Sequence, residues 1–243
     1  MACLSKEAAD ILTNRNEAEL QTAIETHHET LLKQRADCVD YGKPEELTPK
    51  KNARLNCELL KQVLIHRADQ LVTASSTMLA EKNLYGLSLV VRGHIESMAI
   101  LGYFTRRLQS LKAGNITFET FEQDIRNGLM GAKHNLFELG NCPVNILTCV
   151  QHTDKYLDAE FFHEKKEMVE DIYGWLSEFA HPNFCSNKTA FTVDKENNRM
   201  VLRKEQELTE DHIQAMRNLR ISSELFNWLL TAFDERVKED LSE

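Results

Sequence analysis

The longest apolar stretch of the chain, residues 84–111, constrains the fold more than any other feature. Its sequence, LYGLSLVVRGHIESMAILGYFTRRLQSL, places an apolar side chain on nearly every helical turn. Arg92 and Glu96 lie in the middle of it, four residues apart, and therefore on one face of a helix. Because an unpaired buried charge is very costly, this pair needs polar partners from another element. We therefore expect a central core helix that carries a polar cluster.

Composition and charge narrow the class of protein. Only 9 Gly and 4 Pro occur in 243 residues, which favours long helices over a turn-rich β protein. The net charge of −9 disfavours docking on anionic membranes and nucleic-acid binding through a broad basic surface. The 6 cysteines form no CxxC pair, and no secretory signal opens the chain. These features predict a cytoplasmic protein with reduced thiols, no metal site, no cofactor and no membrane contact.

Helical periodicity extends over most of the chain. The segments expected to form helices are residues 4–13, 17–39, 50–82, 84–111, 117–140, 158–180 and 209–239. The pattern of residues 144–156 is ambiguous, with one short helix as its interpretation. The clearest strand–loop–strand pattern, at about residues 188–203, predicts a β-hairpin, which alone is marginal and is expected to lean on the helices. The prediction is an all-α single domain of residues 1–243, an irregular bundle of six to eight helices with one small β-hairpin before the last helix. The helices within residues 1–42 are candidates for a peripheral position.

Several polar side chains interrupt the first helices. His27 and His28 point about 100° apart on a helix, so they cannot face one metal ion from one side, and we interpret them as a solvated pair. His66 and Arg67 are expected at the surface unless they face the central helix.

Two helical faces carry the candidate site. On the central helix, Arg92, Glu96 and Tyr103 are spaced by four and seven residues and share a face. The later helix ends at His181-Pro182, and the side chains that share its face at steps of four are Tyr173, Ser177 and His181. If the two faces meet, these residues form one buried polar network.

Such a network offers defined chemistry. His181 is the candidate general acid or base, Arg92 the clamp for a phosphate, and Glu96 the group that orients Arg92 or His181. The ligand-binding candidates are Tyr103, Tyr173, Ser177 and Asn183. The set suits cleavage of RNA through the ribose 2′-OH. In the alternative interpretation, Arg92 and Glu96 form an internal ion pair and His181 is only a helix stop.

The layout of these motifs resembles a known superfamily. An Arg-x-x-x-Glu helix, a helix ending in Ser-x-x-x-His-Pro, a hairpin and a closing helix look like bacterial all-helical proteins that in turn resemble the HEPN superfamily. The residues that carry the resemblance are Arg92, Glu96, Ser177, His181, Pro182 and Asn183. It spans about residues 50–237. HEPN members include toxin and phage-defence ribonucleases and often act as dimers, so the resemblance implies a homodimer and RNA as the ligand.

The chain departs from the catalytic HEPN pattern, in which a His follows an Arg by four to six residues. Arg92 and His94 are two residues apart, and His181 has no Arg just before it. The leading hypothesis is a HEPN-like protein of stress or phage defence that binds RNA or a phosphate-bearing ligand, and that would be a metal-independent ribonuclease if it is an enzyme. The alternative is a non-enzymatic homo-oligomeric interaction or scaffold protein. A metal-binding bundle would need two Glu-x-x-His motifs, and only Glu178–His181 has that step.

Overall fold

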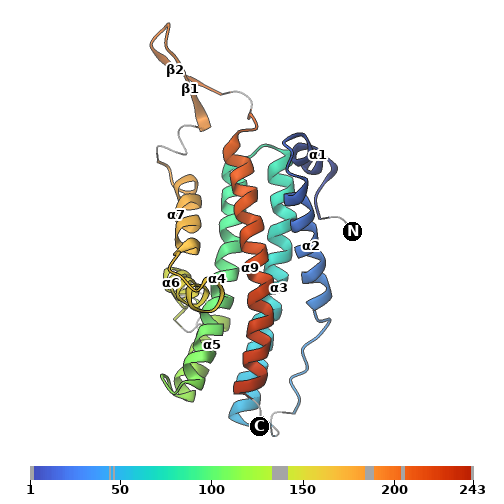
Figure 1. Cartoon of the computed structure of the whole chain (residues 1–243), viewed down its shortest axis with the longest axis vertical. Coiled ribbons are helices and arrows are strands. Elements are labelled where there is room, and N and C mark those ends of the chain that lie inside the picture. Colours follow the sequence, from blue (N-terminus) through green and yellow to red (C-terminus); the bar gives the residue numbers. More distant parts are fainter. Residues whose placement is uncertain are drawn as a thin grey trace.

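The chain forms an elongated helical bundle with a β-hairpin that projects from one end (Figure 1). The computed structural model describes residues 3–43, 45, 47–132, 142–183, 189–203 and 206–241. This part contains eight α-helices, one short π-helix and one two-stranded antiparallel sheet. The predicted fold class is therefore confirmed. Within the described part, no helix combines the length and apolarity that crossing a membrane requires.

Most of the helices lie within the predicted segments or extend beyond them by one residue. Their bounds are α1 Lys6–Asn14, α2 Ala18–Gln34, α3 Pro49–Ala80, α4 Leu84–Lys112, α5 Phe118–Met130, α6 Ile146–Leu157, η2 Asp158–Phe162, α7 Met168–Ala180 and α9 Glu210–Asp240. The strands are β1 Phe191–Asp194 and β2 Arg199–Leu202.

Side-chain caps explain where the long helices begin. The Thr48 hydroxyl accepts a hydrogen bond from the Lys51 N–H at the start of α3, and Pro49 occupies the first helical position. The Asn83 side chain accepts from the Gly86 N–H and starts α4 only three residues after α3 ends. Thr117 caps α5 in the same way. The turn between α3 and α4 therefore fixes the alignment of these two helices.

Helix α4 is the centre of the bundle. It packs against α3, α5, α6, α7 and α9, and its side chains are mostly buried on all sides. Close approach depends on glycine at two places: a Cβ at Gly102 would lie 2.5 Å from the Thr153 side chain of α6, and one at Gly128 would lie 2.6 Å from the Phe104 ring. The absence of a side chain at Gly128 therefore allows α5 to pack closely against α4.

The segment expected to be one helix over residues 158–180 is broken instead. Helix α6 passes directly into η2, and α7 begins only at Met168. His163 and Glu167 adopt left-handed backbone conformations between them, which end one helix and start the next without glycine. The predicted continuation of α5 through residues 133–140 lies outside the described residues.

The hairpin does not lean on the helices as expected. Its strands pair in register from Phe191 opposite Leu202 to Asp194 opposite Arg199. All of its strand residues except Asp194 are exposed, and the two strands project beyond the helical bundle (Figure 1).

Candidate functional site

The predicted contact between the two polar faces exists at Arg92, Glu96 and Tyr173. One guanidinium N–H of Arg92 donates to the Tyr173 hydroxyl at 2.6 Å, and the Arg92 guanidinium carbon lies 4.7 Å from the centre of the Tyr173 ring. Arg92 Nε lies 3.3 Å from Glu96 Oε1, and the Tyr173 hydroxyl donates to the same oxygen at 3.5 Å. Helices α4 and α7 are thus joined by one polar cluster.

Arg67 of α3 completes this cluster. Its Nη2 donates to Glu96 Oε2 at 3.4 Å, and its Nε donates to the Ser97 hydroxyl at 3.1 Å. The Arg67 side chain is nevertheless half exposed, so it lies at the surface and faces the central helix at once. We call Arg67, Arg92, Glu96 and Tyr173 the arginine cluster.

The arginine cluster has an excess of positive charge. Two guanidinium groups share the single carboxylate of Glu96, and the side chains of Arg92 and Glu96 are 23% and 24% exposed. A partly buried charge is screened less than an exposed one. A guanidinium presents five N–H donors in a planar fork, and the hydrogen bonds among the described residues engage only some of them. The site can therefore accept an anion from the side on which Arg67 is exposed.

The other predicted residues of α7 lie apart from the cluster. The Ser177 hydroxyl donates to the Tyr173 carbonyl of its own helix at 2.8 Å. His181 is exposed at the helix end, and eight residues place it about 12 Å along the axis from Tyr173. The Asn183 amide donates to Glu178 at 2.7 Å. The structure therefore brings together three of the seven predicted residues, and His181 is not beside Arg92.

Tyr103 belongs to a different environment. It is buried, with its ring 5.2 Å from that of His152 on α6 and close to Arg107. Eleven residues separate it from Arg92, or about 16 Å of helix. Burial raises the pKa of the Tyr103 hydroxyl, and the nearby Asp124 carboxylate adds to this rise. Tyr103 shares a helical face with Arg92 but meets α6 where Arg92 meets α7.

A second polar cluster lies in the core and was not predicted. His27 Nε2 and His94 Nε2 are 3.0 Å apart, so one of them carries the proton that joins them. His27 Nδ1 lies 2.8 Å from Asn227 Oδ1, and His94 Nδ1 lies 2.8 Å from the Ser222 hydroxyl. Burial lowers the pKa of His27 to about 4 and that of His94 well below its usual value.

The interpretation of His27 and His28 as solvated is wrong. Both are buried, because α2 packs against α9 on one side and α3 on the other. His27 faces α4 and α9, while His28 Nδ1 lies 2.9 Å from Asp69 on α3. Adjacent residues of a helix point about 100° apart, so His27 faces one neighbouring interface of α2 and His28 faces another, and neither is solvated.

Asp154 is the most unusual carboxylate. It is buried on α6 and accepts the backbone N–H groups of Val169 at 2.8 Å and Glu170 at 2.9 Å, so it caps the start of α7 from another helix. Burial raises its pKa to about 6, against the lowering effect of the two N–H groups. Among the described residues no group of three or more His, Cys, Asp or Glu side chains is placed to hold a metal ion.

Comparisons with known proteins return no match among protein-family models, curated proteins or solved structures.

Because Arg92 and His181 lie in different environments, substitutions of these two residues should have different effects on stability. Arg92→Met should lower the free energy of unfolding by about 1–2 kcal/mol, since it removes the contacts of Arg92 with the Tyr173 hydroxyl and with Glu96 at a partly exposed position. His181→Ala should change it by less than about 0.5 kcal/mol because His181 is exposed. Urea unfolding of both variants beside the wild type measures this. Equal losses would show that His181 is coupled to the cluster after all.

Proposed function

We propose that the chain binds a phosphate-bearing ligand at the arginine cluster. The observation that carries this proposal is the sharing of one carboxylate, Glu96, by the two guanidinium groups of Arg67 and Arg92. Planar guanidinium groups match phosphate geometry, and two of them converging on one half-buried site form a clamp. The Tyr173 hydroxyl, already oriented by Arg92, adds a further polar group at the same place.

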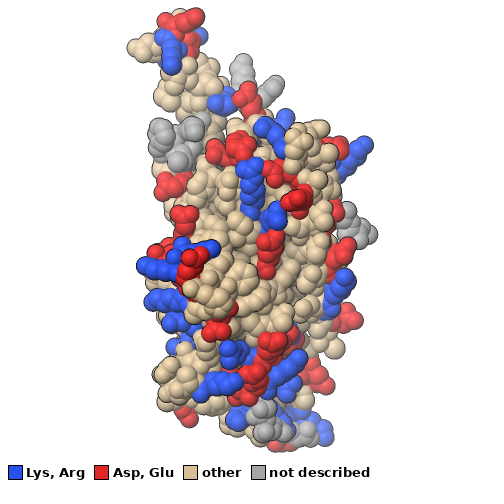
Figure 2. Space-filling model, viewed as in Figure 1, with Lys and Arg blue, Asp and Glu red and all other residues tan. Residues whose placement is uncertain are grey.

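The ligand that we favour is the phosphorylated end of an RNA. The resemblance in layout to the HEPN superfamily, whose members include ribonucleases, supports RNA over a free metabolite. The net charge of −9 supports a local contact with one phosphate rather than a long contact with a nucleic-acid backbone. Figure 2 supports the same choice, because blue and red side chains are interspersed over the visible face without a continuous basic stripe.

The proposal is for binding rather than catalysis. General acid–base catalysis needs a group within hydrogen-bond reach of the reacting proton, or one water away. His181 lies about 12 Å along the axis of α7 from Tyr173. The buried histidines His27 and His94 are engaged with each other in the core. Arg67, Arg92 and Tyr173 are therefore proposed as binding residues and Glu96 as the residue that orients both arginines.

Calorimetric titration tests this proposal. The probes are inorganic phosphate, a 5′-phosphorylated RNA oligonucleotide and the same oligonucleotide with a 5′-hydroxyl. Arg67→Met and Arg92→Met should each weaken binding of the phosphorylated probes at least about tenfold, and the 5′-hydroxyl RNA should bind no better to the wild type than to the variants.

Arg126→Met is the matched control, because Arg126 is about as exposed as Arg67 but pairs with its own glutamate, Glu122, at 2.7 Å. It should bind as the wild type does. Binding of inorganic phosphate alone would indicate a small-molecule ligand. Failure of the wild type to bind any phosphorylated probe, or equal weakening in Arg126→Met, would overturn the proposal.

A further inference from the structure

The β-hairpin has two faces of opposite character. The cross-strand pairs Phe191–Leu202 and Val193–Met200 put four apolar side chains on one face, because alternate residues of a strand share a face. The pairs Thr192–Val201 and Asp194–Arg199 occupy the other, and Asp194 and Arg199 form an ion pair at 2.9 Å. We call the first of these the apolar face.

The apolar face is exposed. Phe191 is 36% exposed, and Val193, Met200 and Leu202 are 66%, 64% and 62% exposed. Figure 2 shows charged side chains at the tip of the projecting hairpin and uncharged atoms below them. An isolated two-stranded hairpin is marginal in water, and grouped exposed apolar side chains mark interaction surfaces.

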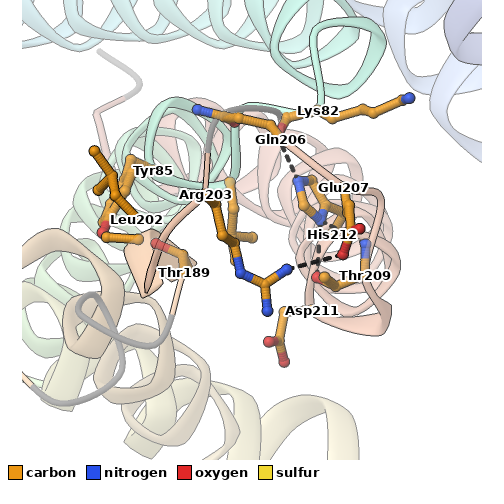
Figure 3. Close-up of a pocket in the computed structure, with 12 residues that line it drawn as sticks. Lys82, Tyr85, Thr189, Leu202, Arg203, Gln206, Glu207, Thr209, Asp211 and His212 are labelled. Carbon is orange, nitrogen blue, oxygen red and sulfur yellow. Dashed lines mark hydrogen bonds and ion pairs between the residues drawn. The ribbon is translucent and has the colours of Figure 1, made fainter. Parts of the chain in front are cut away.

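A pocket of about 270 Å³ opens at the base of the hairpin (Figure 3). Its apolar lining comes from Leu202 of the hairpin, Ala190 just before β1, and Leu84 and Tyr85 at the start of α4. Leu202 therefore belongs both to the apolar face and to the pocket. The volume is below the about 300–1,000 Å³ typical of small-molecule sites, which suits one or two side chains.

Two polar side chains that line this pocket, Arg203 and His212, are already engaged. Figure 3 shows Arg203 paired with Glu207, at 2.9 Å, and His212 bonded on both ring nitrogens. His212 Nδ1 accepts from the Thr209 N–H at 3.1 Å, and its Nε2 donates to the Lys82 carbonyl at 2.9 Å. Because His212 and Arg203 already have partners within the chain, the pocket favours an apolar occupant over a polar ligand.

We propose that this surface docks a second copy of the chain, with the two hairpins packed apolar face to apolar face about a two-fold axis. In that arrangement the tip of each hairpin, with Val193 and Met200, lies over the pocket at the base of the other. An isologous interface is self-complementary, and here a projection, the hairpin tip, and a hollow, the pocket at its base, lie at opposite ends of one surface.

The charges on the hairpin strands also favour docking of a second copy of the chain. The strand charges, Asp194 and Arg199, project from the opposite face and neutralise each other, so like charges do not meet when two apolar faces pack. Two faces and two pocket mouths would bury on the order of 1,000 Å² in total, at the low end of specific interfaces. We therefore expect a dimer of roughly micromolar affinity that forms and dissociates with concentration.

Sedimentation velocity of the full chain over about 1–300 µM tests this. The wild type should shift from monomer to dimer across the range. Val193→Glu/Met200→Glu, which puts charges on the apolar face, should stay monomeric. Thr192→Glu/Val201→Glu is the matched control, because it places the same charges at neighbouring positions of the same strands on the opposite face, and it should dimerise as the wild type does.

Far-UV circular dichroism of both double variants checks the fold, and it should be unchanged because the hairpin projects from the helices. A wild type that remains monomeric throughout would overturn the proposal. So would a dimer that survives in Val193→Glu/Met200→Glu with its helical signal intact, which would place the interface elsewhere. This outcome does not depend on phosphate binding, since the arginine cluster lies on α3, α4 and α7 rather than on the hairpin.

Discussion

The Asp154→Asn variant is expected to lose stability between pH 6 and pH 4 more steeply than the wild type, by about 2 kcal/mol over the interval. The buried carboxyl of Asp154 has its pKa raised from 3.8 to about 6. A raised pKa means that the folded state favours the protonated acid. The stability that Asp154 contributes is therefore fully present below pH 3.8 and is lost as the pH rises through about 6.

The buried histidines change the stability in the opposite direction over the same pH range. Burial lowers the pKa of His27 from 6.5 to about 4, so its neutral form favours the fold above pH 6.5 and this contribution is lost as the pH falls toward 4. His152 behaves alike, with its pKa lowered to about 4 by burial and by the nearby Arg106. In the wild type, protonation of Asp154 offsets part of this loss. Removing the titrating carboxyl removes the offset and exposes the full effect of the histidines.

Urea unfolding at several pH values between 4 and 7 measures the difference. Asp158→Asn is the matched control, because Asp158 follows α6 directly and also accepts a backbone N–H, that of Lys166 at 2.9 Å, but it is less buried. Its curve should run parallel to that of the wild type. Parallel curves for Asp154→Asn and the wild type would show instead that the Asp154 carboxyl does not titrate in this window.

Local signals predicted the elements whose determinants lie within a few residues. The central helix was expected over residues 84–111 and occupies Leu84–Lys112, because the apolar pattern and the Asn83 cap are both encoded locally. The hairpin was found for the same reason. The break between η2 and α7 was missed, since His163 and Glu167 adopt left-handed conformations that glycine or asparagine usually signals.

Helical periodicity predicted only some of the contacts in the candidate site, because it shows which side chains share a face of one helix but not which helix that face meets. It correctly placed Arg92 and Glu96 opposite Tyr173, but a helix as long as α4 meets different neighbours along its length, and Tyr103 therefore packs beside His152. Arg67 was not among the predicted site residues and was expected at the surface unless it faced the central helix, because its contact with Glu96 depends on how the short turn after α3 aligns two helices. The His27–His94 contact joins α2 to α4, and no spacing within either helix encodes it.

The Glu96→Gln variant should be less stable than the wild type but bind phosphate more tightly. The substitution removes the one carboxylate that both Arg67 and Arg92 contact, so we expect a loss of about 2 kcal/mol of unfolding free energy. The same change leaves two positive charges facing each other without an intervening negative charge. A bound phosphate would then replace the missing carboxylate, and its affinity should rise about tenfold or more, or about 1.4 kcal/mol.

Thermal unfolding with and without inorganic phosphate measures both the loss of stability and the gain in phosphate affinity in one experiment. Phosphate should raise the melting temperature of Glu96→Gln more than that of the wild type, because a ligand that binds only the folded state stabilises it more, at a given concentration, the higher its affinity. Glu122→Gln, which removes the partner of the exposed Arg126, is the control and should show neither effect. If Glu96→Gln loses stability and phosphate restores none of it, the two arginines hold α3 to α4 and bind nothing. The opposite signs of the two effects therefore distinguish a binding site from a purely structural ion pair, which the loss of stability alone cannot do.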